Sequence, residues 1–141
     1  MLSEADKNTR KIIRKVAIET RKLISDNRKA LGTSSASLAG LCGHASLALA
    51  HNLRKEGLPA EIAQGVGHWF VKCGSFLVDI TASQFSQGKI CIRDYERTSK
   101  LAKDDSRWMG FWNANRIDKD YKVMGLDYAA MQIKNTLKID L

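Results

Sequence analysis

The sequence predicts an α+β domain in which helices come first and an antiparallel β-sheet follows. Three observations lead to this class. Apolar residues recur at helical spacing over residues 4–29, helical order resumes at about Cys42, and two Val- and aromatic-rich runs flank Cys73 and Gly74. A chain of 141 residues fits one domain with one core. We therefore expect both helices to lie against the sheet that contains the two runs.

Residues 4–29 are expected to form an amphipathic helix with Ser3 as its N-cap. Its apolar stripe consists of Ile12, Ile13, Val16, Ala17, Thr20, Leu23 and Ile24. Its other face is basic, with Lys7, Lys11, Arg14, Lys15, Arg21 and Lys22. Such a face is either a docking surface for phosphate or anionic lipid, or the solvated side of a helix that covers the core. We favour the solvated side, because aromatic residues do not interleave with the basic ones as they do in single-strand nucleic-acid binding.

A loop of small residues over 32–40 precedes the second helix, which is expected to run from Cys42 to about Glu56. Its apolar face contains Leu41, Ala45, Leu49 and Leu53. Gly57 supplies a C-terminal cap, and Pro59 follows where the helix has already stopped. Cys42 therefore stands in the first turn of a helix.

The runs "HWFVK" and "SFLVDI" are expected to form a β-hairpin whose two-residue turn is Cys73-Gly74. This register pairs His68 with Asp79, so that their Cβ atoms lie about 4.5–5.5 Å apart on one face. A slip of one residue would place the two side chains on opposite faces. The hairpin thus predicts a histidine and an aspartate in contact across adjacent strands.

The remaining chain is expected to contain a short strand around residues 89–93 and a helix over 126–139. The domain then divides into an N-terminal helix region (1–31), a catalytic core (38–86) and a C-terminal strand and helix region (87–141).

The composition excludes several classes of protein. No run of eighteen apolar residues exists, and the start "MLSEADKNTRK" lacks the apolar core of a signal peptide, so we expect no membrane span and a cytoplasmic protein, with specialised export left open. Three cysteines without metal-type spacing predict reduced thiols, no disulfide scaffold, no metal and no cofactor. The net charge of +8 is the sole sign of a nucleic-acid partner, which we therefore do not expect.

Cys42, His68 and Asp79 form a constellation suited to nucleophilic catalysis. The thiolate is the attacking species, and a helix N-terminus together with a nearby imidazolium lowers the pKa of a thiol. A carboxylate holds the imidazole in one tautomer and one orientation. The backbone N–H of Cys42 is the expected donor to an oxyanion. Cys73 and Cys91 have no base nearby in the sequence, and we assign them no role.

The stretches "CGHASLALAHNLRKEGLPAEIAQG", "GHWFV" and "FLVDITASQF" resemble the papain-like superfamily, in particular its transglutaminase-like branch. The resemblance covers about residues 38–86. It implies a fold with the catalytic cysteine at a helix N-terminus packed on an antiparallel sheet. By position it implies Cys42 as nucleophile, His68 as base and Asp79 as orienting acid. The chain departs from the papain pattern because no glutamine stands shortly before Cys42.

Two classes of function follow. In the first, the protein is a hydrolase or acyltransferase that acts on an amide or thioester bond of a peptide, a protein or a small amide; peptidase, amidase, deamidase and transglutaminase-like activities all share the required thioester intermediate. In the second, the protein is a binding or regulatory module that kept the fold and lost the reaction. The oligomeric state is not predicted by any motif.

Overall fold

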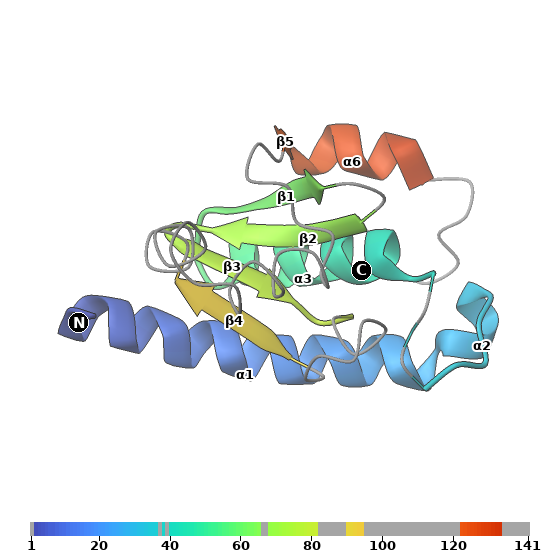
Figure 1. The fold of residues 1–141 in the computed structure, drawn as a ribbon, viewed down its shortest axis with the longest axis horizontal. Helices are drawn as coiled ribbons and strands as arrows, with labels where there is room; N and C mark the ends of the chain where they lie inside the picture. The colour runs from blue at the N-terminus through green and yellow to red at the C-terminus, as the bar shows by residue number, and fades with distance from the viewer. Residues whose placement is uncertain are drawn as a thin grey trace, which may run out of the picture.

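The computed structural model describes residues 2–36, 38, 40–65, 68–81, 90–94 and 122–133, and it has the expected α+β architecture. The described residues form one antiparallel sheet in the order β4-β3-β2-β1-β5, accompanied by helices (Figure 1). The elements are α1 (Glu4–Asp26), α2 (Arg28–Leu31), α3 (Cys42–Lys55), β1 (Ala60–Gly65), β2 (His68–Cys73), β3 (Phe76–Asp79), β4 (Cys91–Asp94), β5 (Lys122–Met124) and α6 (Leu126–Ile133).

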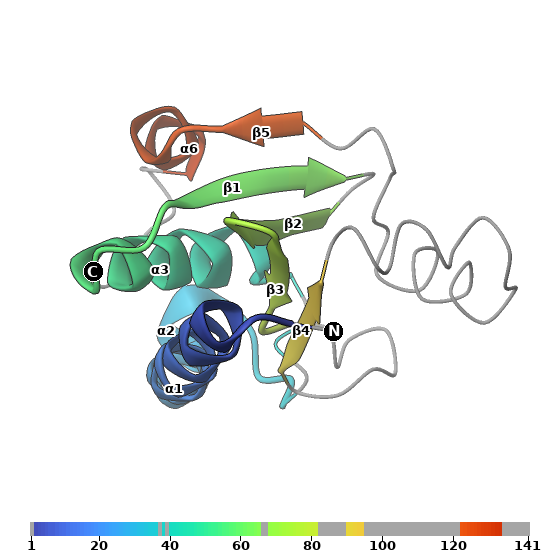
Figure 2. The ribbon, with the colours of Figure 1, turned by 90° about the vertical axis from the view of Figure 1, so that its left-hand side faces the viewer.

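The described helices gather on one side of the sheet. Figure 2 views the sheet nearly edge-on, with α3 beside β1 and β2 and α1 next to α3. α6 follows β5 directly and contacts α3 and β1. The N-terminal helix therefore packs beside the helix that Cys42 opens. Among the described helices, none is long and apolar enough to cross a membrane.

The helix ends follow the local signals in the sequence. Ser3 caps α1, because its Oγ accepts the backbone N–H of Asp6 at 3.1 Å. The helix stops at Asp26 rather than at residue 29, since Asn27 breaks the pattern and folds its side-chain amide onto the Leu23 carbonyl. Past the end of α3, Gly57 adopts a φ of +80°, which is the left-handed conformation that glycine favours.

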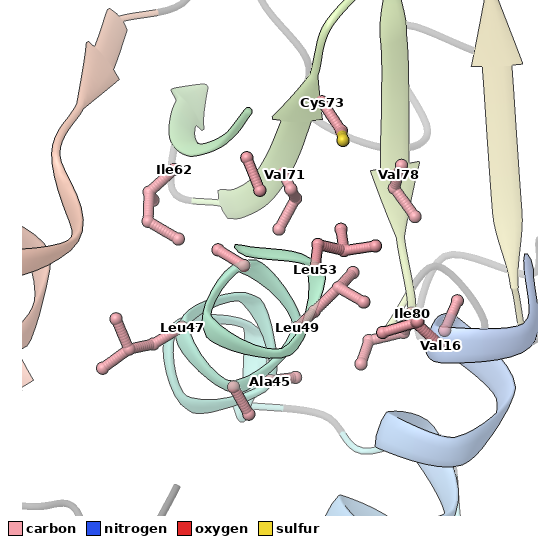
Figure 3. Close-up of a cluster of buried hydrophobic side chains, with 14 of the residues drawn as sticks. Val16, Ala45, Leu47, Leu49, Leu53, Ile62, Val71, Cys73, Val78 and Ile80 are labelled. Atoms are coloured by element: carbon pink, nitrogen blue, oxygen red, sulfur yellow. The ribbon is translucent and has the colours of Figure 1, made fainter. Parts of the chain in front are cut away.

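The core lies between α3, α1 and the sheet (Figure 3). Val71, Val78 and Ile80 direct their side chains from the sheet toward the buried face of α3. Leu49 and Leu53 meet them from the helix, and Val16 of α1 closes the same cluster. The position of α3 on the sheet is therefore set by close-packed aliphatic side chains, which leave little freedom to slide.

Three residues of α1 differ from the sequence prediction. Ile12 and Leu23 are 40% and 39% exposed, and lie at the edge of the apolar stripe. Arg21 does not belong to the basic outer face, since it is only 7% exposed. Its position beside Ala17 and Ile24, four residues before and three after, puts it on the buried face of the helix.

Two strands were not predicted from the sequence. β1 has the sequence AEIAQG, in which Ile62 is the only β-branched residue, yet it pairs with β2 on one side and β5 on the other. β5 has only three residues and pairs Val123 with Ala63. Their strand conformation depends on these neighbours rather than on their own residue types.

The predicted register of the β2–β3 hairpin is wrong by two residues. The turn is Gly74-Ser75, with Gly74 at a φ of +59°, and Cys73 pairs with Phe76. Val71 consequently lies opposite Val78. A shift of two residues keeps every side chain on its expected face, because side chains alternate with a period of two.

The C-terminal predictions hold in part. β4 occupies Cys91–Asp94, close to the strand expected at 89–93. α6 begins at Leu126 as expected, and the part of the 126–139 helix after residue 133 lies outside the described residues.

Ile13→Ala is expected to lower the free energy of unfolding by about 2–5 kcal/mol, because this side chain is 0% exposed and its removal leaves a cavity. Ile12→Ala is the matched control on the same helix, and its expected effect is about 1 kcal/mol or less. Urea unfolding of both variants measures the difference. Equal losses would contradict the placement of α1 on the core.

Candidate active site

The side chains of His68 and Asp79 contact each other across two neighbouring strands of the sheet. His68 opens β2 and Asp79 closes β3, and the two strands are neighbours in the sheet. His68 Nε2 lies 2.7 Å from Asp79 Oδ2. Both residues are buried, at 1% and 5% exposure. The contact expected from the sequence is therefore present, although it is made diagonally across the pair of strands and not between directly opposite residues.

Thr81 holds the second oxygen of the carboxylate. Its backbone N–H donates to Asp79 Oδ1 at 2.9 Å, and its hydroxyl donates to the same oxygen at 3.2 Å. Thr81 is itself buried. Asp79 thus presents Oδ2 to His68 in a fixed orientation. The sequence places a threonine two residues after Asp79, but nothing in the sequence alone indicated this role for it.

Cys42 is the first residue of α3, and the loop before it is well anchored. Leu41 donates its N–H to the carbonyl of Leu38, and Leu38 donates to the carbonyl of Ser35. Leu38 has a φ of +62°, an uncommon conformation for a leucine, while its side chain is fully buried in the core. This burial fixes the chain just before the nucleophile candidate.

The thiol of Cys42 faces the imidazole. His68 and the backbone N–H of Trp69 both lie close enough to the thiol to lower its pKa. Because Nε2 of the ring faces Asp79, we expect the buried Nδ1 to be the nitrogen that exchanges a proton with the thiol. The three side chains therefore form one line, in the order carboxylate, imidazole, thiol.

The electrostatics of the line favour a thiolate beside an imidazolium. Burial raises the pKa of Cys42, but the hydrogen bonds from His68 and from Trp69 N–H, with the charge of His68, lower the pKa below the ordinary thiol value. Burial lowers the pKa of His68, whereas the hydrogen bonds to Asp79 and Cys42 and their charges raise that pKa to about 9. Between the lowered pKa of Cys42 and the raised pKa of His68, the thiol and the imidazole are both charged.

The other two thiols lie in different surroundings. Burial raises the pKa of Cys73 to about 11, and burial likewise raises the pKa of Cys91 to about 11. Both are free and buried, whereas Cys42 is only partly buried. Within the described ranges, no three His, Cys, Asp or Glu side chains come together as a metal site would need.

The first turn of α3 offers donors for an oxyanion. The leading N–H groups of a helix have no carbonyl one turn earlier within the helix, and they carry its positive end. In α3 these are the N–H groups of Cys42, Gly43 and His44. The N–H of Cys42 belongs to the same residue as the sulfur, and it stays the oxyanion donor predicted from the sequence.

No protein-family model, curated protein or solved structure matches this chain. The chemistry of the site is therefore argued from its own contacts and charges.

Cys42 is expected to react with iodoacetamide at about pH 6, where Cys73 and Cys91 remain protonated and unreactive. His68→Ala should move the pH midpoint of Cys42 alkylation upward past the ordinary value of about 8.5, because burial then raises the thiol pKa without opposition from the imidazolium. Mass spectrometry of each thiol against pH gives the three profiles. Three coincident profiles in the native wild-type protein would exclude Cys42 as an activated thiol.

Proposed function

We propose that this protein is a thiol-dependent hydrolase or acyltransferase that acts on an amide or thioester bond through Cys42, His68 and Asp79. The observation that carries the proposal is the buried hydrogen-bonded pair of His68 and Asp79, with a thiol at a helix N-terminus close enough to the imidazole for its pKa to be lowered. A buried imidazole held on one nitrogen by a carboxylate, with a thiol on the other, is the arrangement that covalent catalysis by cysteine requires.

In the first half of the proposed reaction, the Cys42 thiolate attacks the carbonyl carbon. The C–S bond forms while the carbonyl electron pair moves onto oxygen, where the N–H of Cys42 donates to it. When the pair returns, the bond to the leaving amine or thiol breaks, and His68 gives its Nδ1 proton to the leaving atom. The product of this half is a thioester on Cys42 and a neutral imidazole.

In the second half, water or an amine attacks the thioester. His68 now accepts a proton from the attacking group, the C–S bond breaks, and the resting thiolate and imidazolium are restored. Water gives hydrolysis, as in a peptidase, amidase or deamidase, and an amine gives acyl transfer. The same three residues serve both outcomes, so the substrate class is a peptide, a protein or a small amide.

The fold supports a relationship to the papain-like superfamily and its transglutaminase-like branch as part of the proposal. The nucleophile candidate opens a helix that packs on an antiparallel sheet, and the histidine and aspartate follow on adjacent strands in that order. Three free cysteines suit a reducing compartment such as the cytoplasm, which we propose as the location.

A binding or regulatory module is the second candidate. It is favoured by one departure from the papain pattern: no glutamine stands among residues 32–41, so the oxyanion would depend on backbone N–H groups alone. Such a module would retain the lowered pKa of the Cys42 thiol but would not catalyse a reaction.

Cys42→Ala is expected to abolish acylation by an activated ester, and the double variant with His68→Ala should be no slower than Cys42→Ala alone, since residues that act as one unit do not lose rate additively. Cys73→Ala is the control, because it removes a buried thiol remote from this chemistry and should leave the acylation rate unchanged. Single-turnover acylation followed by mass spectrometry measures each rate. Equal acylation of wild type and His68→Ala would favour the binding module.

Asp79→Asn is expected to slow acylation about 100-fold or more while the protein remains folded. The Thr81 N–H still requires an acceptor at Oδ1, so the new amide turns its NH₂ toward His68 Nε2. The ring proton must then sit on Nδ1, which can no longer accept the proton of the thiol. Thermal melts separate this effect from the expected loss of about 1–3 kcal/mol in stability. A wild-type rate in a folded Asp79→Asn protein would leave the carboxylate without a catalytic role.

A further inference from the structure

Arg21 is a buried arginine that connects α1 to two segments of the candidate site. Its Nη1 donates to the carbonyl of Ile80, and its Nη2 donates to the carbonyl of Ala36 at 3.2 Å. Both hydrogen bonds connect Arg21 to residues outside α1, so neither belongs to the hydrogen bonding of the helix itself. The guanidinium therefore joins three parts of the chain at one point.

The two acceptors are placed on either side of the proposed chemistry. Ile80 immediately follows Asp79, so its carbonyl marks the end of the strand that carries the carboxylate. Ala36 lies in the loop that leads to Cys42. The planar fork of a guanidinium can donate in two directions at once, which the single ammonium of a lysine does less well.

The positive charge of Arg21 also interacts with the Asp79 carboxylate of the candidate site. Burial lowers the pKa of Arg21, and the charge of Asp79 raises that pKa. Burying a cation is costly, and the other basic residues of α1 named above avoid that cost by remaining on its outer face. A buried cation that serves only to cover the core would be poorly chosen, since an apolar residue would do so better.

We infer that Arg21 is a positioning residue, whose guanidinium fastens the Asp79 strand end to the Cys42 loop and thereby keeps the thiol aligned with the imidazole. The inference rests on the proposed function. Arg21 acts through the other residues of the site. It donates to two backbone carbonyls, and in these hydrogen bonds it touches neither the Cys42 sulfur nor the His68 ring.

The titratable and charged groups of the region come from every element around it. α3 contributes Cys42 and His44, β2 contributes His68, and β3 and β4 contribute Asp79 and Cys91. Only Cys42 combines partial exposure with a lowered thiol pKa, so its alkylation reports alignment without interference from Cys91.

The test measures Cys42 alkylation against pH in the full chain, with iodoacetamide as the probe. Arg21→Met removes both hydrogen bonds and the charge, and should raise the pH midpoint of Cys42 by about one unit, which is about a tenfold loss of rate at pH values well below the midpoint. Arg21→Lys retains the charge and one donor, and should restore at least half of that shift. Arg54→Met is the control, because Arg54 also donates to a backbone carbonyl, that of Ala60 at 2.7 Å, but from the far end of α3. Its Cys42 profile should equal that of the wild type.

A purely structural Arg21 would lower the melting temperature and leave the pH midpoint unchanged. A folded Arg21→Met protein with the wild-type Cys42 profile would therefore overturn the inference. If Arg21→Met does not fold, Arg21→Gln keeps one amide donor without charge, and a wild-type profile there has the same meaning. An ordinary Cys42 profile in the wild type would instead defeat the proposed function itself, so the two failures are distinguishable.

Discussion

The buried hydrogen bond between His68 Nε2 and Asp79 Oδ2 is the interaction on which the candidate site depends. Two ionisable groups are almost wholly removed from water there, and such a pair recovers its desolvation cost only when its geometry is good and its other atoms are also bonded. Thr81 meets that condition for the carboxylate, and Cys42 lies close to the imidazole. Removing Asp79 or Thr81 would leave a buried polar group unsatisfied, and we therefore expect the residues of the site to act as one unit.

The apolar core determines how close the thiol comes to that pair. Leu49 and Leu53 of α3 pack against Val71 and Val78, which belong to the same strands as His68 and Asp79. A close-packed interface of this kind has few alternative arrangements, so the start of α3 is held at one distance from the start of β2. Ordinary hydrophobic packing thus supplies the alignment that the polar residues require.

The sequence predicts what is decided locally and misses what neighbours decide. Ser3 and Gly57 mark helix ends through their own local chemistry. The contact between His68 and Asp79 was predicted correctly although the predicted turn was wrong, because a register shift of two residues keeps each side chain on the same face. The strand at Ala60–Gly65 could not be predicted, since its conformation comes from pairing on both sides. Arg21 was assigned to the basic face by its charge, although its spacing from Ala17 and Ile24 places it on the buried face, where it reaches two backbone carbonyls.

The three thiols show that position rather than residue type decides reactivity in this protein. Cys73 and Cys91 are buried in strands, and burial alone moves their pKa upward. Burial also raises the pKa of Cys42, yet the His68 imidazole and the backbone N–H of Trp69 reverse the direction. Stability alone does not explain this arrangement, because an apolar residue of similar volume would pack at the same place without a buried histidine and aspartate. The cost is understandable if the thiolate itself is what the fold maintains.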